Sequence, residues 1–268
     1  MSNKKILIEI GHPAHVHFFA PVIGKLEKAG HSVFVTTRNK DITNALLDRK
    51  GIFYQCLSHP AKGKLALGVE LISRWGKMIY LIRKHNIRLA VSISGISTSL
   101  PARVAGIRNI VFTDTEDAAI SNRIAFPFAD AICTPQFFLK DLGVKHRRYP
   151  GLHELLYLQD ADLTQIGKTK KELGLPDRYV IIRLVANNAV HDWNIRGLSE
   201  TDVRALIHTL SSVGEVFISS EGPLPASLDQ YRLETPIEQV HSVLAGAQVF
   251  VGESPTMAVE ASLLGTPA

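Results

Sequence analysis

Short runs of β-branched and aromatic residues alternate with helical patterns along the whole chain. In the first half, we predict strands at residues 6–10, 32–36, 52–56, 89–93, 109–113 and 130–133. Helices are predicted between them at residues 18–29 and 40–50, and apolar residues recur at helical spacing from Leu65 to Ile82. This alternation is typical of a parallel sheet that helices cover on both faces.

The pattern resumes after Tyr149-Pro150-Gly151, with strands predicted at residues 179–185, 215–219 and 248–251 and helices near 201–212 and 237–245. The charge balance changes sign at the same place. Residues 1–150 hold 22 Lys and Arg against 10 Asp and Glu, whereas residues 151–268 hold 8 against 15. We therefore predict two α/β domains, residues 1–150 and 151–268. Gly265-Thr266-Pro267 resembles a turn into a further strand, so we expect the second domain to be incomplete.

Composition narrows the class of protein. With 46% apolar residues, the chain can bury a large core, which excludes a disordered or low-complexity protein. No uncharged run approaches the roughly 20 residues of a spanning helix, and the N-terminus does not resemble a signal peptide, so we expect a cytoplasmic protein. The two cysteines lack metal-ligand spacing. The sequence contains no nucleic-acid module, so we expect no nucleic-acid partner.

Functional groups in parallel α/β sheets gather at the carboxyl ends of strands. The first such segment is Gly11-His12-Pro13-Ala14-His15-Val16-His17. Its glycine permits close backbone approach, and His15 or His17 is suited to act as a general base or to hold a substrate phosphate. The segment is not a GxGxxG fingerprint, so NAD is not indicated and we expect no cofactor. Two alternatives remain open: a metal site, or loop histidines that pack between the domains.

Two further strand ends carry polar groups. Ser94-Gly95-Ile96-Ser97-Thr98-Ser99 offers four hydroxyls at the start of a helix, with Ser97 a candidate substrate contact and helix capping the alternative. Thr113-Asp114-Thr115-Glu116-Asp117 brings three carboxylates to one strand end, which is costly without a cationic or hydroxylic partner. Asp114 and Glu116 are therefore candidate site residues. Arg123 lies in the following helix, where it is able to reach this cluster or to be solvated.

The most specific segment runs from Val251 to Pro267. A strand ends at Gly252, and Ser254-Pro255 begins a helix whose free backbone N–H groups form an anion site. Glu260 is placed to accept hydrogen bonds from a diol such as a ribose. The alternative is an ordinary capped helix with a surface glutamate.

These residues carry a resemblance. Glu260-Ala261-Ser262-Leu263-Leu264-Gly265-Thr266-Pro267 resembles the E-x-x-x-x-G-x-P nucleotide-sugar motif of GT-B proteins, which include a lipid-acceptor N-acetylglucosaminyltransferase and the UDP-N-acetylglucosamine 2-epimerases. The segments 11–19, 113–116 and 252–257 together are similar to an uncharacterised prokaryotic family described as predicted glycosyltransferases. The resemblance implies a GT-B fold, with two Rossmann-like doubly wound domains that face a cleft.

The same resemblance implies roles for individual residues. The C-terminal domain would bind a nucleotide-sugar donor, most simply a UDP-sugar, without an obligatory metal. Glu260 would hold the ribose. The diphosphate would meet Arg183 and the residues that begin the last helix, which are Gly252, Ser254, Thr256 and Met257. On the N-terminal, acceptor-side domain, His15 would be the base or a sugar contact, and Glu116 would match a functional glutamate of the epimerases. Gly11, His12 and His17 would line the same site.

One departure bears on the reaction. The epimerase pattern Gly-Asp-Thr is Gly95-Ile96-Ser97 here, so isoleucine replaces a carboxylate associated with epimerisation. We therefore favour metal-independent glycosyl transfer by direct displacement. The alternatives are an epimerase-like enzyme or a non-catalytic nucleotide-sugar-binding protein.

The acceptor is not identified by the sequence. A basic helical region contains Lys62, Lys64, Arg74, Lys77, Arg83 and Lys84, with Trp75 and Met78 interleaved. Such a face suits an anionic lipid surface, so a lipid-linked acceptor and peripheral membrane contact are one expectation. A helix with a solvated basic face is the alternative. A homodimer is a further possible assembly.

Overall fold

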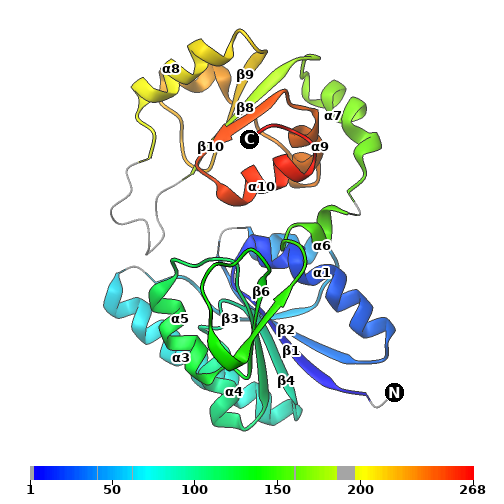
Figure 1. Cartoon of the computed structure of the whole chain (residues 1–268), viewed down its shortest axis with the longest axis vertical. Helices are drawn as coiled ribbons and strands as arrows, with labels where there is room; N and C mark the ends of the chain where they lie inside the picture. The colour runs from blue at the N-terminus through cyan, green and yellow to red at the C-terminus, as the bar shows by residue number, and fades with distance from the viewer. Residues whose placement is uncertain (1–2, 41, 62, 160, 186–196) are drawn as a thin grey trace. The chain divides into compact units, whose positions relative to one another are not determined.

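The computed structural model describes residues 3–40, 42–61, 63–159, 161–185 and 197–268. The chain divides into two compact units, Met1–Leu156 and Tyr157–Ala268. Each unit contains its own parallel sheet with helices beside it (Figure 1). The mixed α/β class predicted from the alternation is confirmed.

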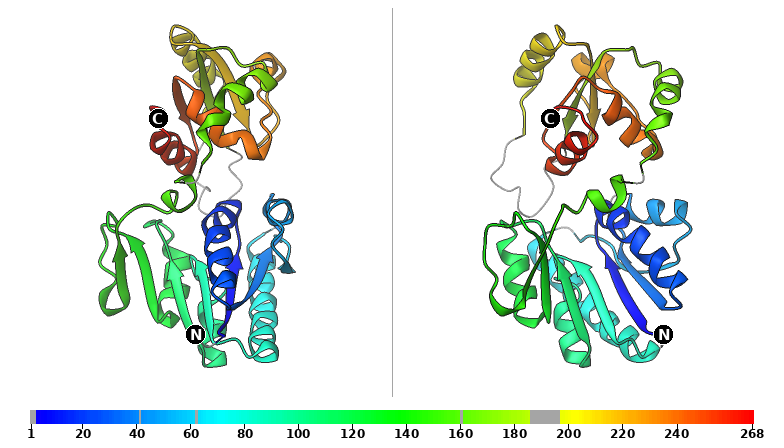
Figure 2. Two further views of the ribbon diagram at one scale, coloured as in Figure 1. Left: turned by 90° about the vertical axis from the view of Figure 1, so that its right-hand side faces the viewer. Right: turned by 45° about the vertical axis from the view of Figure 1, so that its right-hand side comes forward.

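The first unit is built on a seven-stranded sheet in which every pair of neighbours is parallel. The strand order is β3-β2-β1-β4-β5-β6-β7, and Figure 2 shows the sheet as a twisted open array. Its strands are β1 (Lys5–Ile10), β2 (Ser32–Arg38), β3 (Tyr54–Ser58), β4 (Leu89–Ile93), β5 (Arg108–Phe112), β6 (Ala131–Pro135) and β7 (His146–Tyr149).

Helices connect these strands and cover the sheet. They are α1 (Pro13–Lys28), α2 (Thr43–Arg49), α3 (Lys64–His85), α4 (Ser99–Ala105), α5 (Ala119–Ala125) and α6 (Leu155–Leu158), with short 3₁₀ turns at Phe126–Phe128 and Gly143–Lys145. Leu7 of β1 packs with Met78 and Ile82 of α3 in one buried cluster. Because side chains alternate along a strand, Ile6, Ile8 and Ile10 face the other side, which α1 covers.

The second unit has a three-stranded parallel sheet in the order β10-β8-β9. Its strands are β8 (Tyr179–Leu184), β9 (Glu215–Ser220) and β10 (Val249–Gly252). Its helices are α7 (Ile166–Leu173), α8 (Glu200–Leu210), α9 (Val240–Gly246) and α10 (Pro255–Leu263), with 3₁₀ turns at Leu163–Gln165, Ala226–Tyr231 and Ile237–Gln239. The central strand β8 is buried on both faces, with Tyr179 and Ile181 in one cluster and Val180 and Ile182 in the other.

The first helix and the third strand begin at other residues than predicted, and one strand was not predicted. The first helix begins at Pro13 rather than at Phe18, because Pro13 occupies its first turn and His12 caps it. Strand β7 was not predicted, since its sequence His-Arg-Arg-Tyr is charged, as suits a strand at the edge of a sheet. Strand β3 begins at Tyr54 instead of Ile52.

In the part of the chain that the structure describes, no helix combines the length and the apolar character needed to cross a bilayer.

Candidate functional site

The strand order of the first sheet reverses between β1 and β4. The connection after β1 leads through α1 to β2 on one side, and the connection after β4 leads through α4 to β5 on the other. Ligands of open α/β sheets bind at such a switch point, outside the carboxyl ends of the strands. The segments that begin at Gly11 and Ser94 follow these two strands directly. Two of the predicted site segments therefore lie at the switch point.

The histidines after β1 belong to a helix start rather than to a loop, which corrects the prediction. His12 is the N-cap of α1, and its Nδ1 accepts from the backbone N–H of Ala14 at 3.3 Å. His15 lies in the first turn, where its Nδ1 accepts from the N–H of Gly11 at 3.3 Å. The two rings are 5.8 Å apart between centroids. His17, also predicted, follows on α1 and is partly buried.

His15 is held in its neutral form. Burial is the main cause that lowers its pKa to about 3, helped by the charge of His12 and opposed by that of Asp114. Because Nδ1 accepts a hydrogen bond, the ring proton belongs on Nε2. His15 is therefore an uncharged N–H donor near neutral pH, which favours a ligand contact over a general base.

The hydroxyls after β4 are turned into the protein. Ser97 is 1% exposed, and its hydroxyl bonds to the buried carboxylate of Glu9. Thr98 Oγ1 lies 2.6 Å from Ser92 Oγ, and Ser99 Oγ accepts from Asn109 at 2.8 Å. Thr98 is the N-cap of α4 but makes no capping bond with its side chain. Helix capping, the alternative for these hydroxyls, is therefore wrong for Thr98, and Ser97, the candidate substrate contact, supports Glu9 from within the protein.

The carboxylates after β5 separate into two environments. Nδ1 of His153 lies 3.0 Å from Oδ2 of Asp114, and Thr115 Oγ1 donates to Oδ1 at 3.0 Å. Burial would raise the pKa of Asp114, but the hydrogen bond and charge of His153 outweigh it, so the pKa lies below its ordinary value. Glu116 instead accepts from the backbone N–H of Leu139 at 2.7 Å, which ties down the loop after β6.

Arg123 is exposed on α5. Among the residues with described positions, no ion pair joins it to the Asp114–Asp117 segment, and Asp117 lies 4.0 Å from Lys140 instead.

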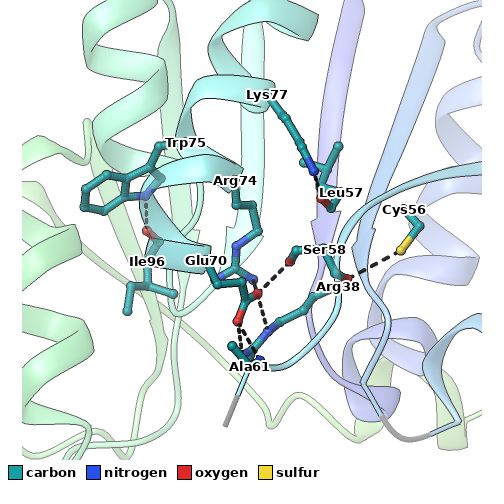
Figure 3. Close-up of polar contacts among 10 residues, drawn as sticks. All are labelled: Arg38, Cys56, Leu57, Ser58, Ala61, Glu70, Arg74, Trp75, Lys77 and Ile96. Carbon is teal, nitrogen blue, oxygen red and sulfur yellow. Dashed lines mark hydrogen bonds and ion pairs between the residues drawn. The ribbon is translucent and has the colours of Figure 1, made fainter. Parts of the chain in front are cut away.

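Beside the switch point, α3 carries buried charges, drawn in Figure 3. Arg38, the last residue of β2, donates from Nε and Nη2 to Glu70 at 2.9 and 2.7 Å. Ser58 Oγ donates to the same carboxylate at 2.6 Å, and Arg74 Nη1 lies 4.0 Å from it. Burial raises the pKa of Glu9, and the charge of Arg74 opposes that shift.

These contacts remove Arg74 and Met78 from the predicted basic face of α3, on which Lys64, Lys77, Arg83 and Lys84 are exposed. Arg74 and Met78 are buried, and Trp75 Nε1 and Lys77 Nζ donate to the carbonyls of Ile96 and Leu57 at 2.9 and 2.6 Å (Figure 3). Lys62 lies outside the described residues.

In the second sheet the strand order reverses between β8 and β10, and the remaining predicted residues follow these strands. Ser254 is the N-cap of α10, its Oγ accepts from Met257 N–H at 3.4 Å, and Pro255 starts the helix as predicted. Thr256 is exposed in the first turn. A Cβ on Gly252 would lie 2.6 Å from Cβ of Arg183, so the close approach of β8 and β10 requires glycine there.

Arg183 is anchored at the end of β8. Its Nη1 donates to Ser219 Oγ at 2.8 Å and its Nη2 to Glu221 Oε1 at 2.7 Å. Its Nε is buried without a hydrogen-bond partner among the described atoms. These two bonds use two of the five N–H donors of the guanidinium, and the Nε donor is buried in the protein. Ala186 and Asn187, which follow in the sequence, lie outside the described residues.

Glu260 is buried rather than being a surface glutamate. Its Oε1 accepts from the Tyr157 hydroxyl at 2.6 Å and lies 3.9 Å from His241 Nε2. The rings of Tyr157 and His241 stack with centroids 5.9 Å apart. A buried carboxylate with a phenol donor is placed to exchange that donor for a ligand hydroxyl.

A metal was one alternative for the histidines after β1. The described residues include no group of three or more His, Cys, Asp or Glu side chains placed to hold a metal ion.

Residues 4–175 match the family model described as "Protein of unknown function (DUF354)". The chain belongs to this DUF354 family. An uncharacterized protein of Methanocaldococcus jannaschii is 27% identical to it over 140 residues, which are 50% of this chain and 40% of that relative.

The family model ends at residue 175, but similar solved structures cover nearly the whole length of this DUF354 protein. It is similar to a UDP-GlcNAc 2-epimerase from Neisseria meningitidis bound to UDP-GlcNAc, with a TM-score of 0.73, 14% identity and coverage of 98% of this chain and 81% of that one. It is also similar to a spinosyn forosaminyltransferase, with a TM-score of 0.62, 15% identity and coverage of 99% and 79%. The expected GT-B fold is confirmed.

Sequence reasoning missed His153 and Tyr157. Both follow the Tyr149-Pro150-Gly151 segment, at which the domain boundary was predicted, and both contact a predicted site carboxylate. Polar residues directly after the last strand of a sheet were the available signal.

Proposed function

We propose that this DUF354 protein is a glycosyltransferase that moves a sugar from a nucleotide-diphosphate sugar to an acceptor hydroxyl without a metal. The observation that carries the proposal is Glu260, a buried carboxylate in the second half of the capped helix α10, in the nucleotide-sugar motif. The fold supports it, because similar structures include a protein bound to UDP-GlcNAc and a sugar transferase. A UDP-sugar is the proposed donor.

The second unit would bind the donor. The ribose hydroxyls would replace the Tyr157 phenol on Glu260, since both are hydroxyl donors. The diphosphate would lie at the start of α10, where the Thr256 N–H and the Ser254 and Thr256 hydroxyls would donate to it, since Pro255 has no N–H and the Met257 N–H donates to Ser254. Arg183, whose side chain is 18% exposed, would add an Nη N–H that its bonds to Ser219 and Glu221 leave unused.

The first unit would bind the acceptor alcohol and supply the general base. Asp114 is ionised at neutral pH and its side chain is 40% exposed, so it is the proposed base. The acceptor oxygen would form a bond to the anomeric carbon while the bond from that carbon to the diphosphate breaks. The proton would pass to Asp114, and His15 would donate to a substrate oxygen. Glu116 would act by holding the loop that carries Leu139.

A non-catalytic nucleotide-sugar-binding protein is the second candidate. The observation that favours it is Glu116, whose carboxylate already accepts a bond from Leu139 N–H. Epimerisation is disfavoured because Ile96 stands where a carboxylate is expected, and its carbonyl accepts from Trp75.

Release of free nucleoside diphosphate, measured with and without candidate acceptor alcohols, tests the transferase. Acceptor-dependent release that Asp114→Asn reduces at least a hundredfold is expected from loss of a general base. Saturable UDP-sugar binding with no release, unaffected by His15→Ala or Glu116→Ala, would instead identify a binding protein. Failure to bind any UDP- or GDP-sugar would exclude both.

The outer face of α3 supports a lipid-linked acceptor and peripheral membrane contact at the cytoplasmic face. Leu65, Val69, Ile72 and Tyr80 recur at helical spacing and are exposed, with Leu65 at 89%. Lys64, Arg83 and Lys84 are exposed on the same helix. Apolar side chains flanked by cations suit the surface of an anionic bilayer.

A further inference from the structure

His153 and Asp114 form a pair with unequal exposure. His153 belongs to the segment between β7 and α6, and its Nδ1 lies 3.0 Å from Oδ2 of Asp114. The side chain of His153 is 7% exposed and that of Asp114 is 40% exposed. The carboxylate therefore faces outward at the carboxyl edge of the first sheet, and the imidazole lies behind it.

Aromatic rings hold the imidazole in place. The Phe18 ring lies 4.6 Å from it between centroids, and the Tyr149 ring stacks on it at 6.1 Å with an interplanar angle of 9°. Phe112 contacts it at 6.5 Å. Nε2 is buried and has no hydrogen-bond partner among the described atoms. A ring fixed in this way directs Nδ1 at Asp114, and an ionised carboxylate requires a proton on that nitrogen.

We propose that His153 is the positioning residue for Asp114, fixing the direction of its carboxylate and stabilising its ionised form. This inference rests on the proposed function only in that Asp114 is the proton acceptor there. His153 does not touch substrate, because it is buried behind Asp114. The pair resembles other hydrogen-bonded carboxylate–histidine pairs, in which one side chain orients the other. Here the carboxylate of Asp114 is the exposed member.

Other titratable groups lie around the pair and have to be considered when the Asp114 titration is interpreted. The charges of His12, Lys40, His153 and Asp114 act on His15 of α1, and those of Asp114 and Glu154 act on Tyr149 of β7. Thr115 donates the other hydrogen bond to Asp114. Substitutions at His153 leave all of the other groups in place, so a change in the Asp114 titration is assigned to the imidazole.

Two substitutions separate the N–H donor from the packing. His153→Phe keeps an aromatic ring among Phe18, Phe112 and Tyr149 but removes the donor. His153→Asn places an amide N–H near the position of Nδ1. Asp141→Asn is the matched control, since Asp141 lies 3.6 Å from His146 in a second aspartate–histidine pair of the same unit.

The experiment is a carbon-13 NMR titration of the Asp114 carboxyl in the full chain, with the signal assigned by Asp114→Asn. His153→Phe is expected to raise the titration midpoint by about 1 pH unit, because an opposing partner lowers a carboxyl pKa by about 1–3 units. His153→Asn is expected to restore at least half of that shift, and Asp141→Asn to leave the midpoint unchanged. An unchanged midpoint in a folded His153→Phe protein would overturn the proposal.

The readout is independent of turnover, so failure of the proposed function is distinguishable. A shifted midpoint without nucleoside diphosphate release supports the positioning role and rejects the transferase. If release occurs, the acid limb of its pH profile should move upward with His153→Phe by the same amount as the NMR midpoint. If the acid limb of the pH profile of release stays at the same pH in His153→Phe, the positioning role is overturned, but the proposed transferase activity is not.

Discussion

Individual residues at the strand ends take their roles from burial and hydrogen bonding rather than from residue type. Glu260, Glu116 and Asp114 are all carboxylates after parallel strands, yet they have different partners. Glu260 holds a phenol, Glu116 holds a loop and Asp114 pairs with an imidazole. Only Glu260 and Asp114 are therefore assigned ligand contacts here.

Glu260→Gln should weaken UDP binding about tenfold, because a charge-assisted hydrogen bond contributes about 1.5–3 kcal/mol and an amide retains part of it. Isothermal titration calorimetry measures the effect. Glu200→Gln, an exposed glutamate of α8, is the matched control and should bind UDP as the wild type does. Equal affinity of wild type and Glu260→Gln would remove Glu260 from the donor site.

His15 should make stability depend on pH. Its folded pKa of about 3 lies below the ordinary value of 6.5, so the unfolded chain binds the additional proton between these values. The stabilisation is complete above about pH 6.5 and is lost as the pH falls toward 3, with a slope of up to about 1.4 kcal/mol per pH unit. Urea unfolding of the wild type and His15→Asn at several pH values checks this. A slope that the substitution does not reduce would contradict the buried neutral imidazole.

At the scale of elements, the close approach of two strands and the burial of one face of a helix decide the positions of site residues. Strands β8 and β10 approach so closely at Gly252 that a Cβ there meets both the backbone and the side chain of Arg183. The glycine that was interpreted as part of an anion site is thus required first by strand spacing. Likewise, α3 directs Arg74 inward and Leu65 outward, which a list of basic residues does not reveal.

Gly252→Ala should destabilise the second unit by about 1–3 kcal/mol, the usual cost of overpacking. Gly222→Ala is the control, because no atom lies within 4 Å of the Cβ position there. Thermal unfolding followed by circular dichroism compares them. Equal midpoints for the two variants would show that β8 and β10 can separate without cost.

The exposed face of α3 predicts binding to vesicles that contain anionic lipid. Combined substitution Leu65→Ser, Val69→Ser and Ile72→Ser should reduce co-sedimentation at least tenfold, because three exposed apolar side chains lose their burial in lipid. Val144→Ser, which changes a valine that is 91% exposed elsewhere in the unit, is the control. Co-sedimentation that changes neither with the substitutions nor with the anionic lipid content would reject membrane contact.

At the scale of the whole molecule, the two units carry opposite net charge and separate sheets. The acidic unit carries the proposed phosphate site, so the hydrogen-bond donors at the start of α10 and Arg183, rather than net charge, must hold the anion. Hydrogen exchange in the presence of UDP should therefore slow mainly in residues 252–260. Protection that is confined to the first unit would reverse the proposed division between donor and acceptor.

The sequence alone determined the α/β class, the positions of most strands and the capped start of α10, because strand alternation and helix capping are local properties. It also carried the GT-B resemblance, since the Glu260-to-Pro267 motif is contiguous. Tertiary structure decided which polar groups are used internally. Ser97 and Arg74 both interact with the buried carboxylate of Glu9. His153 pairs with Asp114, which lies 39 residues earlier in the sequence. No local pattern reports such pairing, because it depends on which segments the sheet order brings to the same edge.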